Sequence, residues 1–256
     1  MTEELRFAAP PVRAVELTLL FDPAPLMLTS LAPLVSELRR RFPTIVERFA
    51  RVPWSVESAS AEGVEYIPEG SDQLPFPWLT FANDEGHSIA FQDDRFQLRW
   101  EFGDDRGYPG YDTLRSDLET HFASFVAHTQ SSTSVEVAVR RARAEYENSM
   151  PLDVPWTVAR LTFGAQGTAG DLLPDLVASH TGGGFHLEDD NIVTHVDFAA
   201  FADPEDASLS LRSTSRFADD TGVDASLSLL DVAHRRLIEC FDTLTTSEQQ
   251  ADWGRQ

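Results

Sequence analysis

Two histidines that interrupt apolar helical patterns are the residues best suited to acid–base chemistry. His234 lies within a stripe of leucine and phenylalanine side chains spaced three and four residues apart, and His121 occupies a similar place in an earlier pattern. A histidine that lines a pocket can transfer a proton near neutral pH. The more economical interpretation is a core histidine with one hydrogen bond satisfied. No nucleophile accompanies them: Cys240 is not one turn away on the same helical face, and no Gly-x-Ser-x-Gly motif occurs.

A glycine series in the second half is the pattern closest to a cofactor site. The stretch LTFGAQGTAGD resembles a dinucleotide-binding turn, and its glycines are Gly164, Gly167 and Gly170. Its spacing is Gly-x-x-Gly-x-x-Gly, Pro174 interrupts the helix that follows, and a hairpin comes next in place of a parallel strand. We therefore interpret it as a loop with Asp171 as a helix N-cap. Thr181–Gly184 could cradle a phosphate, but a helix C-cap before a hairpin fits it better, because acidic residues follow it.

A metal site is the other chemistry that the sequence raises. His186 and His195 are expected on the polar face of a hairpin as diagonal neighbours, with Asp197 beyond, and two imidazoles with a carboxylate can bind a metal ion. A solvated face explains the same residues, and no His-Glu-x-x-His or His-x-His spacing supports a metal. We therefore expect neither a metal nor another cofactor.

Composition excludes several classes of function. All 20 basic residues among the 256 are arginine, which excludes Schiff-base, pyridoxal phosphate and P-loop chemistry because each requires a lysine. The single cysteine excludes an internal disulfide and a cysteine-rich zinc site. No apolar run is long enough to span a bilayer, and the N-terminus lacks the basic and apolar regions of a signal peptide. We therefore expect a cytoplasmic protein.

The net charge of −22 is unevenly distributed. Residues 1–60 hold seven acids and seven arginines, whereas residues 61–256 hold 35 acids and 13 arginines. This charge repels nucleic acid and anionic lipid, so neither is an expected partner. Solubility is one explanation for the acidity, and attraction to a basic protein is the other.

The elements that must position these residues are organised around two hairpins. Ile89–Phe102 alternates apolar and polar residues about a predicted turn at Asp93–Asp94. Pairing across that turn gives an apolar face, which includes Phe91 and Phe102, and a wet face, which includes Gln92. Phe185–Phe198 repeats the design about Asp189–Asp190.

The remaining elements follow from periodicity and breakers. Strands are predicted at Val12–Phe21, near Val64–Ile67, and at Trp78–Phe81, Val135–Met150, Val154–Phe163 and Ser208–Phe217. For Val135–Met150 a helix is the alternative. Helices are predicted from a Ser30 cap to Arg41, from Pro43 to Phe49, and at Tyr111–His128, Asp171–Ser179 and Asp224–Thr243, with a linker at Ser131–Ser134.

The fold that these elements predict is α+β, a mainly antiparallel sheet with helices packed on one face. Each half contains a strand, a helix, an acidic-turn hairpin and a closing helix. We expect residues 1–130 and 131–256 to be two similar halves of one compact unit.

Four segments resemble a known family: PPVRAVELTLLF at the start, LRWEF with YPGY after the first hairpin, RAEYEN at Arg143–Asn148, and AHRRLIECFDTLT with WGR at the end. As an ordered set they resemble a sporadically distributed bacterial family of duplicated α+β proteins. Where this chain has Ala144 to Asn148, family members often carry Arg-Tyr-hydrophobic-Asn, so that segment departs in part. The resemblance implies a coherent fold and no particular activity.

Two functional hypotheses follow. The first is a non-enzymatic module that binds a basic protein, with a toxin-neutralising, immunity-like or defence-associated role. The second is a small-molecule-binding protein or enzyme with a pocket between the two halves. Aromatic and arginine side chains are enriched at binding surfaces. The candidate ligand or partner surface comprises Trp100, Tyr108, Tyr111, His121, Arg143, Tyr146, Asn148 and His234, although ordinary core packing would use the same residues.

Overall fold

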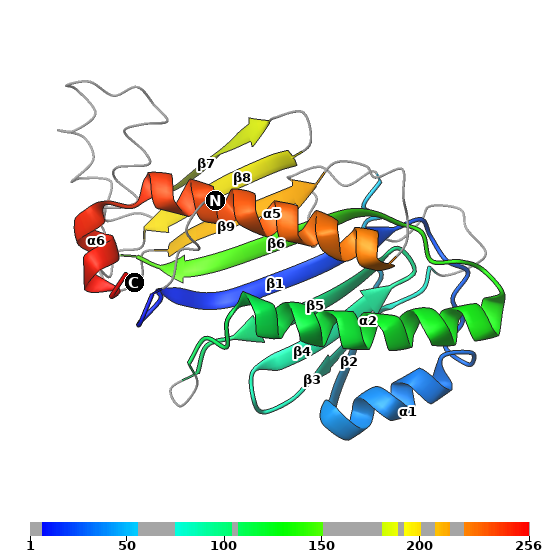
Figure 1. Cartoon of the computed structure of the whole chain (residues 1–256). Helices are drawn as coiled ribbons and strands as arrows, with labels where there is room; N and C mark the ends of the chain where they lie inside the picture. Colours follow the sequence, from blue (N-terminus) through cyan, green and yellow to red (C-terminus); the bar gives the residue numbers. More distant parts are fainter. Residues whose placement is uncertain are drawn as a thin grey trace. The chain divides into compact units, whose positions relative to one another are not determined.

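The structure is a computed structural model that describes residues 7–55, 75–103, 107–150, 181–188, 192–200, 208–215 and 223–255. These ranges contain nine strands and four helices (Figure 1). The strands are β1 (Val12–Phe21), β2 (Thr44–Arg48), β3 (Trp78–Ala82), β4 (His87–Gln92), β5 (Arg95–Glu101), β6 (Val139–Ser149), β7 (Thr181–Glu188), β8 (Ile192–Ala200) and β9 (Ser208–Ser215). The helices are α1 (Ala32–Arg41), α2 (Tyr111–Thr133), α5 (Val223–Leu244) and α6 (Ser247–Asp252). The expected α+β class is confirmed.

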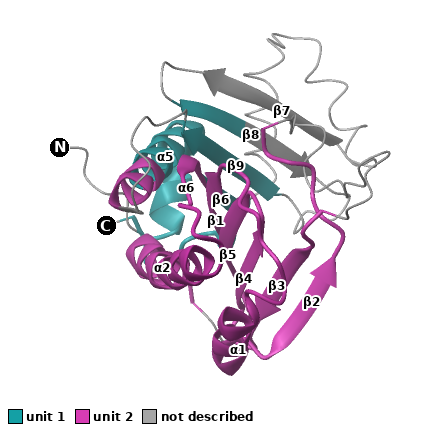
Figure 2. Ribbon diagram, turned by 90° about the vertical axis from the view of Figure 1, so that its right-hand side faces the viewer, with its two compact units in different colours: residues 1–15, 144–216, 231–256 teal, residues 16–143, 217–230 magenta. Residues whose placement is uncertain are grey.

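The strand order is β2-β3-β4-β5-β1-β6-β9-β8-β7, so β2 is a terminal strand. The neighbours from β2 to β5 pair in antiparallel fashion, as do those from β7 to β9. Two compact units are distinguished (Figure 2): unit 1 comprises residues 1–15, 144–216 and 231–256, and unit 2 comprises residues 16–143 and 217–230. No helix in the described ranges is both long and apolar enough to cross a membrane.

The first hairpin provides the core of unit 2. Its predicted register is confirmed, with Gln92 opposite Arg95 and Phe91 opposite Phe96. The apolar face packs against α2, where the rings of Phe122 and Phe125 lie 5.5 and 5.2 Å from that of Phe96. Alternation of apolar residues therefore predicted this face correctly, except at its end, where Phe102 is exposed.

The opposite face of this hairpin is buried, so the prediction of a wet face is wrong near the turn. Gln92, Arg95 and Gln97 are buried, and residues 51 and 52 bind the first two. Gln92 accepts a hydrogen bond from the backbone N–H of Arg51 (2.7 Å) and donates one to its carbonyl (3.1 Å). Arg95 donates to the carbonyl of Val52 at 2.6 Å. The polar side chains thus bind a covering segment of the same chain in place of water.

The turn at Asp93–Asp94 is held by contacts from outside the hairpin. Neither residue has a positive φ, so the turn is not one of the primed types that two-residue hairpins favour. Instead the backbone N–H groups of Phe21 and Ala24 donate to the carbonyls of Asp94 and Asp93 at 3.0 and 2.7 Å. The Asp94 carboxylate accepts from the N–H of Trp54 at 2.8 Å.

In unit 1 the second hairpin has a different register from the predicted one. Glu188 lies opposite Val193, whereas a two-residue turn at Asp189–Asp190 would place it opposite Asn191. The turn residues themselves, 189–191, lie outside the described residues. Thr181–Gly184 belongs to β7 and pairs with β8, so the predicted helix cap and loop is wrong there, and these residues form no phosphate-binding loop.

The two ends of unit 1 are joined to each other. Phe7 and Arg255 form an antiparallel bridge, and Ala8 donates its N–H to the carbonyl of Gly254 at 3.1 Å. The ring of Phe7 lies 5.9 Å from those of both Phe241 and Trp253. Gly254 has φ +70°, and a Cβ there would lie 2.9 Å from the Cβ of Ala8, so both backbone conformation and space require glycine.

Several predicted element bounds need correction. The segment after Pro43 is the strand β2 and not a short helix. Ser30 does not cap α1, whose N-cap position is occupied by Leu31 without a side-chain bond. Helix α2 continues through the predicted linker to Thr133. Val135–Met150 is a strand as favoured, although β6 begins only at Val139. The predicted elements near Val64–Ile67 and between residues 151 and 180 lie outside the described residues.

Candidate functional site

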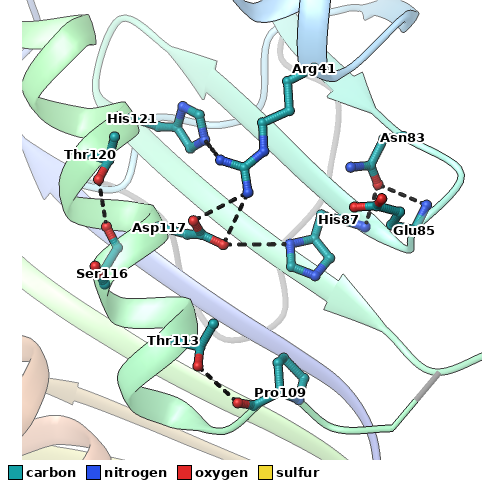
Figure 3. Close-up of polar contacts among 10 residues, drawn as sticks. All are labelled: Arg41, Asn83, Glu85, His87, Pro109, Thr113, Ser116, Asp117, Thr120 and His121. Atoms are coloured by element: carbon teal, nitrogen blue, oxygen red, sulfur yellow. Dashed lines mark hydrogen bonds and ion pairs between the residues drawn. The ribbon is translucent and has the colours of Figure 1, made fainter.

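A polar cluster around His121 joins three elements of unit 2 (Figure 3). Arg41, the last residue of α1, reaches α2, where one guanidinium nitrogen lies 3.2 Å from Nε2 of His121. The other lies 3.3 Å from an Asp117 carboxylate oxygen. The second oxygen of Asp117 lies 3.9 Å from Nδ1 of His87 on β4. Residues one helical turn apart on α2 therefore share one arginine.

Burial and the neighbouring cation keep His121 neutral. Its side chain is almost fully buried, and burial lowers its pKa below the ordinary value of 6.5, with the positive charge of Arg41 lowering it further. Because the guanidinium can only donate, Nε2 of His121 is the acceptor and the ring proton resides on Nδ1. The lone pair needed to accept a proton is occupied, so this geometry ties α1 to α2 and does not present a general base.

A serine and a histidine lie close together in the same helix, but they do not form a nucleophile and its base. Nδ1 of His128 lies 2.8 Å from the backbone carbonyl of Ser124, so this nitrogen carries the proton. The hydroxyl of Ser124 donates to Glu37 of α1 at 3.0 Å. Neither contact draws a proton from the hydroxyl towards the imidazole, as nucleophilic catalysis requires.

Three of the predicted surface residues come together in unit 1. The ring of Tyr146 on β6 lies 5.7 Å from that of His234 on α5. The amide of Asn148 donates to the carbonyl of Leu209 at 3.2 Å. Tyr146 and Asn148 are buried, so their side chains join β6 to its neighbours and are not available to a partner. His234 is only half-buried.

The other predicted surface residues belong to unit 2 and are divided between core and rim. Trp100 is buried and packs on Tyr108 with ring centroids 5.6 Å apart. Tyr108, Tyr111 and Arg143 are half-buried. The eight candidates therefore occupy separate places and do not converge on one surface in either unit.

The predicted histidine pair on the second hairpin has a different geometry from the expected diagonal. His186 lies directly opposite His195 in the β7–β8 register, and Arg212 of β9 lies opposite His195 on its other side. Arg212 binds Glu145 of β6 through two contacts at 2.8 and 3.0 Å. A cation beside His195 disfavours a metal ion. In the described ranges no three histidine, cysteine or acidic residues are grouped to hold one. The glycine series at 164–170 lies outside these ranges.

Among the elements whose burial the structure describes, the terminal strand β2 is the most exposed. All five of its residues are exposed, and Ile45 and Val46, which point to opposite faces, are 38% and 39% exposed. Phe49, just after the strand, is 57% exposed. Among the described strands, β2 pairs along one edge, with β3. This strand was not predicted, although the β-branched run Thr44–Val46 directly after a proline was a signal for it.

The charges around β2 differ from those of the chain as a whole. Residues 39–51 contain five arginines and a single acid, Glu47, in a protein with a net charge of −22. Arg39 and Arg40 end helix α1, and Arg48 ends β2. All three are exposed. The exposed edge therefore carries a local positive charge.

Comparison with known proteins adds no assignment. No protein-family model matches the chain, and no curated protein is detectably similar to it.

Proposed function

We propose that this protein is a non-enzymatic protein-binding module that takes up an extended segment of its partner at the outer edge of β2. The observation that carries the proposal is the exposure of every residue in that terminal strand, with apolar side chains on both faces. An unpaired strand edge presents a row of backbone donors and acceptors that another strand can satisfy.

The composition of β2 supports this proposal. Proteins usually protect a sheet edge with charged side chains, proline or a bulge within the strand, and in β2 the charges are confined to the last two residues, Glu47 and Arg48. Pro43 stands before β2 and not in it, and Ile45, Val46 and Phe49 leave apolar surface on the strand and just beyond it. Five residues of strand span about 17 Å, enough for a short extended segment to pair along its length.

The wider expectations from the sequence also stay proposals. The excess of acids after residue 60 supports a basic protein as a partner at surfaces other than β2. Toxin-neutralising, immunity-like and defence-associated roles are forms that such binding could take in the cytoplasm. The two acidic-turn hairpins support a duplicated α+β architecture. The four ordered segments support a relationship to the bacterial family that the chain resembles.

The β2 edge is tested by replacing its apolar side chains without changing its charge. Ile45→Asn combined with Val46→Asn removes both apolar contacts and introduces a residue that is disfavoured in strands. The matched control is Val135→Asn with Val232→Asn, because both valines are also exposed apolar residues, at 37% each. Proteins from a lysate at low and moderate salt are captured on the wild type and both variants.

We expect a partner that the wild type and the control retain and that the β2 variant loses. Equal retention by all three proteins would show that the partner binds elsewhere and would contradict the role of β2. Circular dichroism of each variant checks that the sheet is intact.

A further inference from the structure

The positive charge along β2 indicates what kind of segment the edge accepts. Of the five arginines in residues 39–51, two are engaged within the protein. Arg41 binds Asp117, and the guanidinium of Arg51 lies 4.0 Å from the ring centroid of Trp78. Arg41 stays 49% exposed in that ion pair, and the other exposed cations are Arg39 and Arg40 in the last turn of α1 and Arg48 at the end of β2.

The register of β2 with β3 assigns these groups to faces. Val46 and Arg48 lie opposite Thr80 and Trp78, and Ile45 lies opposite Phe81 on the other face. A strand added to the outer edge continues both faces, so alternate side chains meet the Val46–Arg48 row. That row offers one apolar contact and one cation two residues apart, and the other face carries Ile45 and Glu47. A segment that presents an apolar side chain and a carboxylate two residues apart on the same face matches the Val46–Arg48 row.

A second copy of the chain does not fit this edge. Antiparallel pairing of β2 with itself about Val46 would place Arg48 opposite Thr44 and Glu47 opposite Ile45, so no cation would meet a carboxylate. The exposed Arg39, Arg40 and Arg48 of both copies would add like charge beside the pair. A basic segment meets the same repulsion. The net charge of −22 acts less strongly here, because charges beyond about 8–10 Å are largely screened at physiological ionic strength.

We propose that the β2 edge binds an acidic extended segment of another protein, which presents carboxylate and apolar side chains alternately along one face. This inference rests on the proposed strand addition and specifies the chemistry of the partner at that site. It is distinct from the basic partner suggested by the total charge, because the edge and the remainder of the chain carry opposite charge.

The test uses the full chain and three designed probes. The first is a fluorescein-labelled peptide of about eight residues, long enough to pair with β2, in which valine and glutamate alternate at every second position and threonine fills the positions between them. The second replaces every glutamate with lysine. The third keeps the glutamates but carries N-methyl groups on alternate backbone amides along one edge, which removes hydrogen-bond donors without changing the charge. Binding is measured by fluorescence anisotropy at two salt concentrations.

A charge-reversal variant locates the binding. Arg48→Glu changes the cation at the end of β2, and Arg235→Glu, at an exposed arginine of α5, makes the same change of net charge elsewhere. We expect the glutamate probe to bind saturably, about tenfold more weakly to Arg48→Glu and unchanged to Arg235→Glu, and more weakly at high salt. We also expect the N-methylated probe to lose binding.

The outcomes separate the inference from the proposed function. Suppose that the lysine and glutamate probes bind equally, that both need unmethylated amides, and that both lose binding when Ile45 and Val46 are replaced. Strand addition then stands and the acidic preference is overturned. If the N-methylated probe binds as well as its parent, or no probe binds, the edge does not add a strand, and both the inference and the proposed function are overturned. If Arg235→Glu weakens binding as much as Arg48→Glu, net charge and not β2 governs it, and the inference fails.

Discussion

The buried pair of Asp94 and Arg95 gives the sharpest test of how unit 2 is held together. The carboxylate is 1% exposed and the arginine 2%, with Oδ1 of Asp94 2.9 Å from Nε of Arg95. Asp94→Ala removes the carboxylate that neutralises the buried guanidinium of Arg95, which keeps its bond to the Val52 carbonyl. The substitution also removes the acceptor of the Trp54 backbone N–H. Neither turn residue has a positive φ, so alanine is compatible with the backbone.

The expected loss of stability is large. Removing one member of a buried ion pair costs about 3–5 kcal/mol, and leaving a buried N–H unpaired costs about 1–3 kcal/mol. Since the two contributions overlap, we expect the free energy of unfolding to fall by about 4–6 kcal/mol, a large part of the ~5–15 kcal/mol typical of a folded protein. Replacing both members, as Asp94→Leu with Arg95→Met, should recover most of the loss, because no buried charge is then uncompensated.

A matched pair isolates the contribution of burial. Asp22 binds Arg140 through contacts of 2.7 and 2.9 Å, distances similar to those in the buried pair, but it is 52% exposed. Asp22→Ala should cost no more than about 1 kcal/mol. Urea unfolding followed by tryptophan fluorescence and by circular dichroism measures both variants and checks that the two signals coincide. If Asp94→Ala costs no more than Asp22→Ala, the reasoning from burial is wrong.

Three further predictions concern single side chains. Burial and the charge of Asp94 raise the pKa of Asp93 from 3.8 to about 6. The folded state therefore loses stability as the pH rises through this interval, and Asp93→Asn should stabilise the protein at about pH 7 by about 1–2 kcal/mol after allowance for solvent screening, with little effect at about pH 4 in urea titrations. Burial lowers the pKa of His121, so its contribution has the opposite sign and stability is lost as the pH falls below 6.5. His121→Gln should reduce that loss, and a difference between variant and wild type that does not change with pH would contradict it. Thr246 caps α6 through the N–H of Gln249, so Thr246→Ala should cost about 1 kcal/mol, measured against Thr243→Ala, whose threonine is exposed within α5.

Local patterns predicted the elements whose burial they encode. Val12–Phe21 has the bounds expected of it, because its alternating residues face a core and Pro11 and Pro23 bracket the segment. The helix predicted at Asp224–Thr243 is observed as α5 at Val223–Leu244. The prediction succeeded because leucines at helical spacing are buried along this helix. The pairing within the first hairpin followed from the position of its turn.

Contacts between distant segments could not be predicted from such patterns. Gln92 and Arg95 have the types expected of a solvated face, but they are buried and bind residues 51 and 52, about 40 positions away. The arginine that reaches His121 comes from a helix 80 residues earlier. In both cases the local sequence specifies which side chains share a face, and the tertiary fold specifies what covers that face.

Two misses had local causes that can be identified. A helix was predicted after Pro43, but Thr44, Ile45 and Val46 are all β-branched and lose side-chain freedom in a helix, which favours the strand β2. The predicted linker after His128 continues helix α2, and the hydroxyls of Ser131, Ser132 and Thr133 donate to carbonyls three or four residues earlier. These polar side chains are therefore satisfied within the helix, although their residue types favoured a linker.

The bridge between Phe7 and Arg255 limits when unit 1 can be completed. During synthesis, Phe7 emerges long before Trp253 and Arg255, so its contacts with them and the bonds of Ala8 and Ala9 cannot form on a nascent chain that still lacks residues 253–255. Closing contacts between segments so far apart in sequence is entropically costly and slow. Residues 7–9 must therefore wait until residues 253–255 have been translated, and until then a chaperone or a misfolded pairing can compete for the apolar side chains.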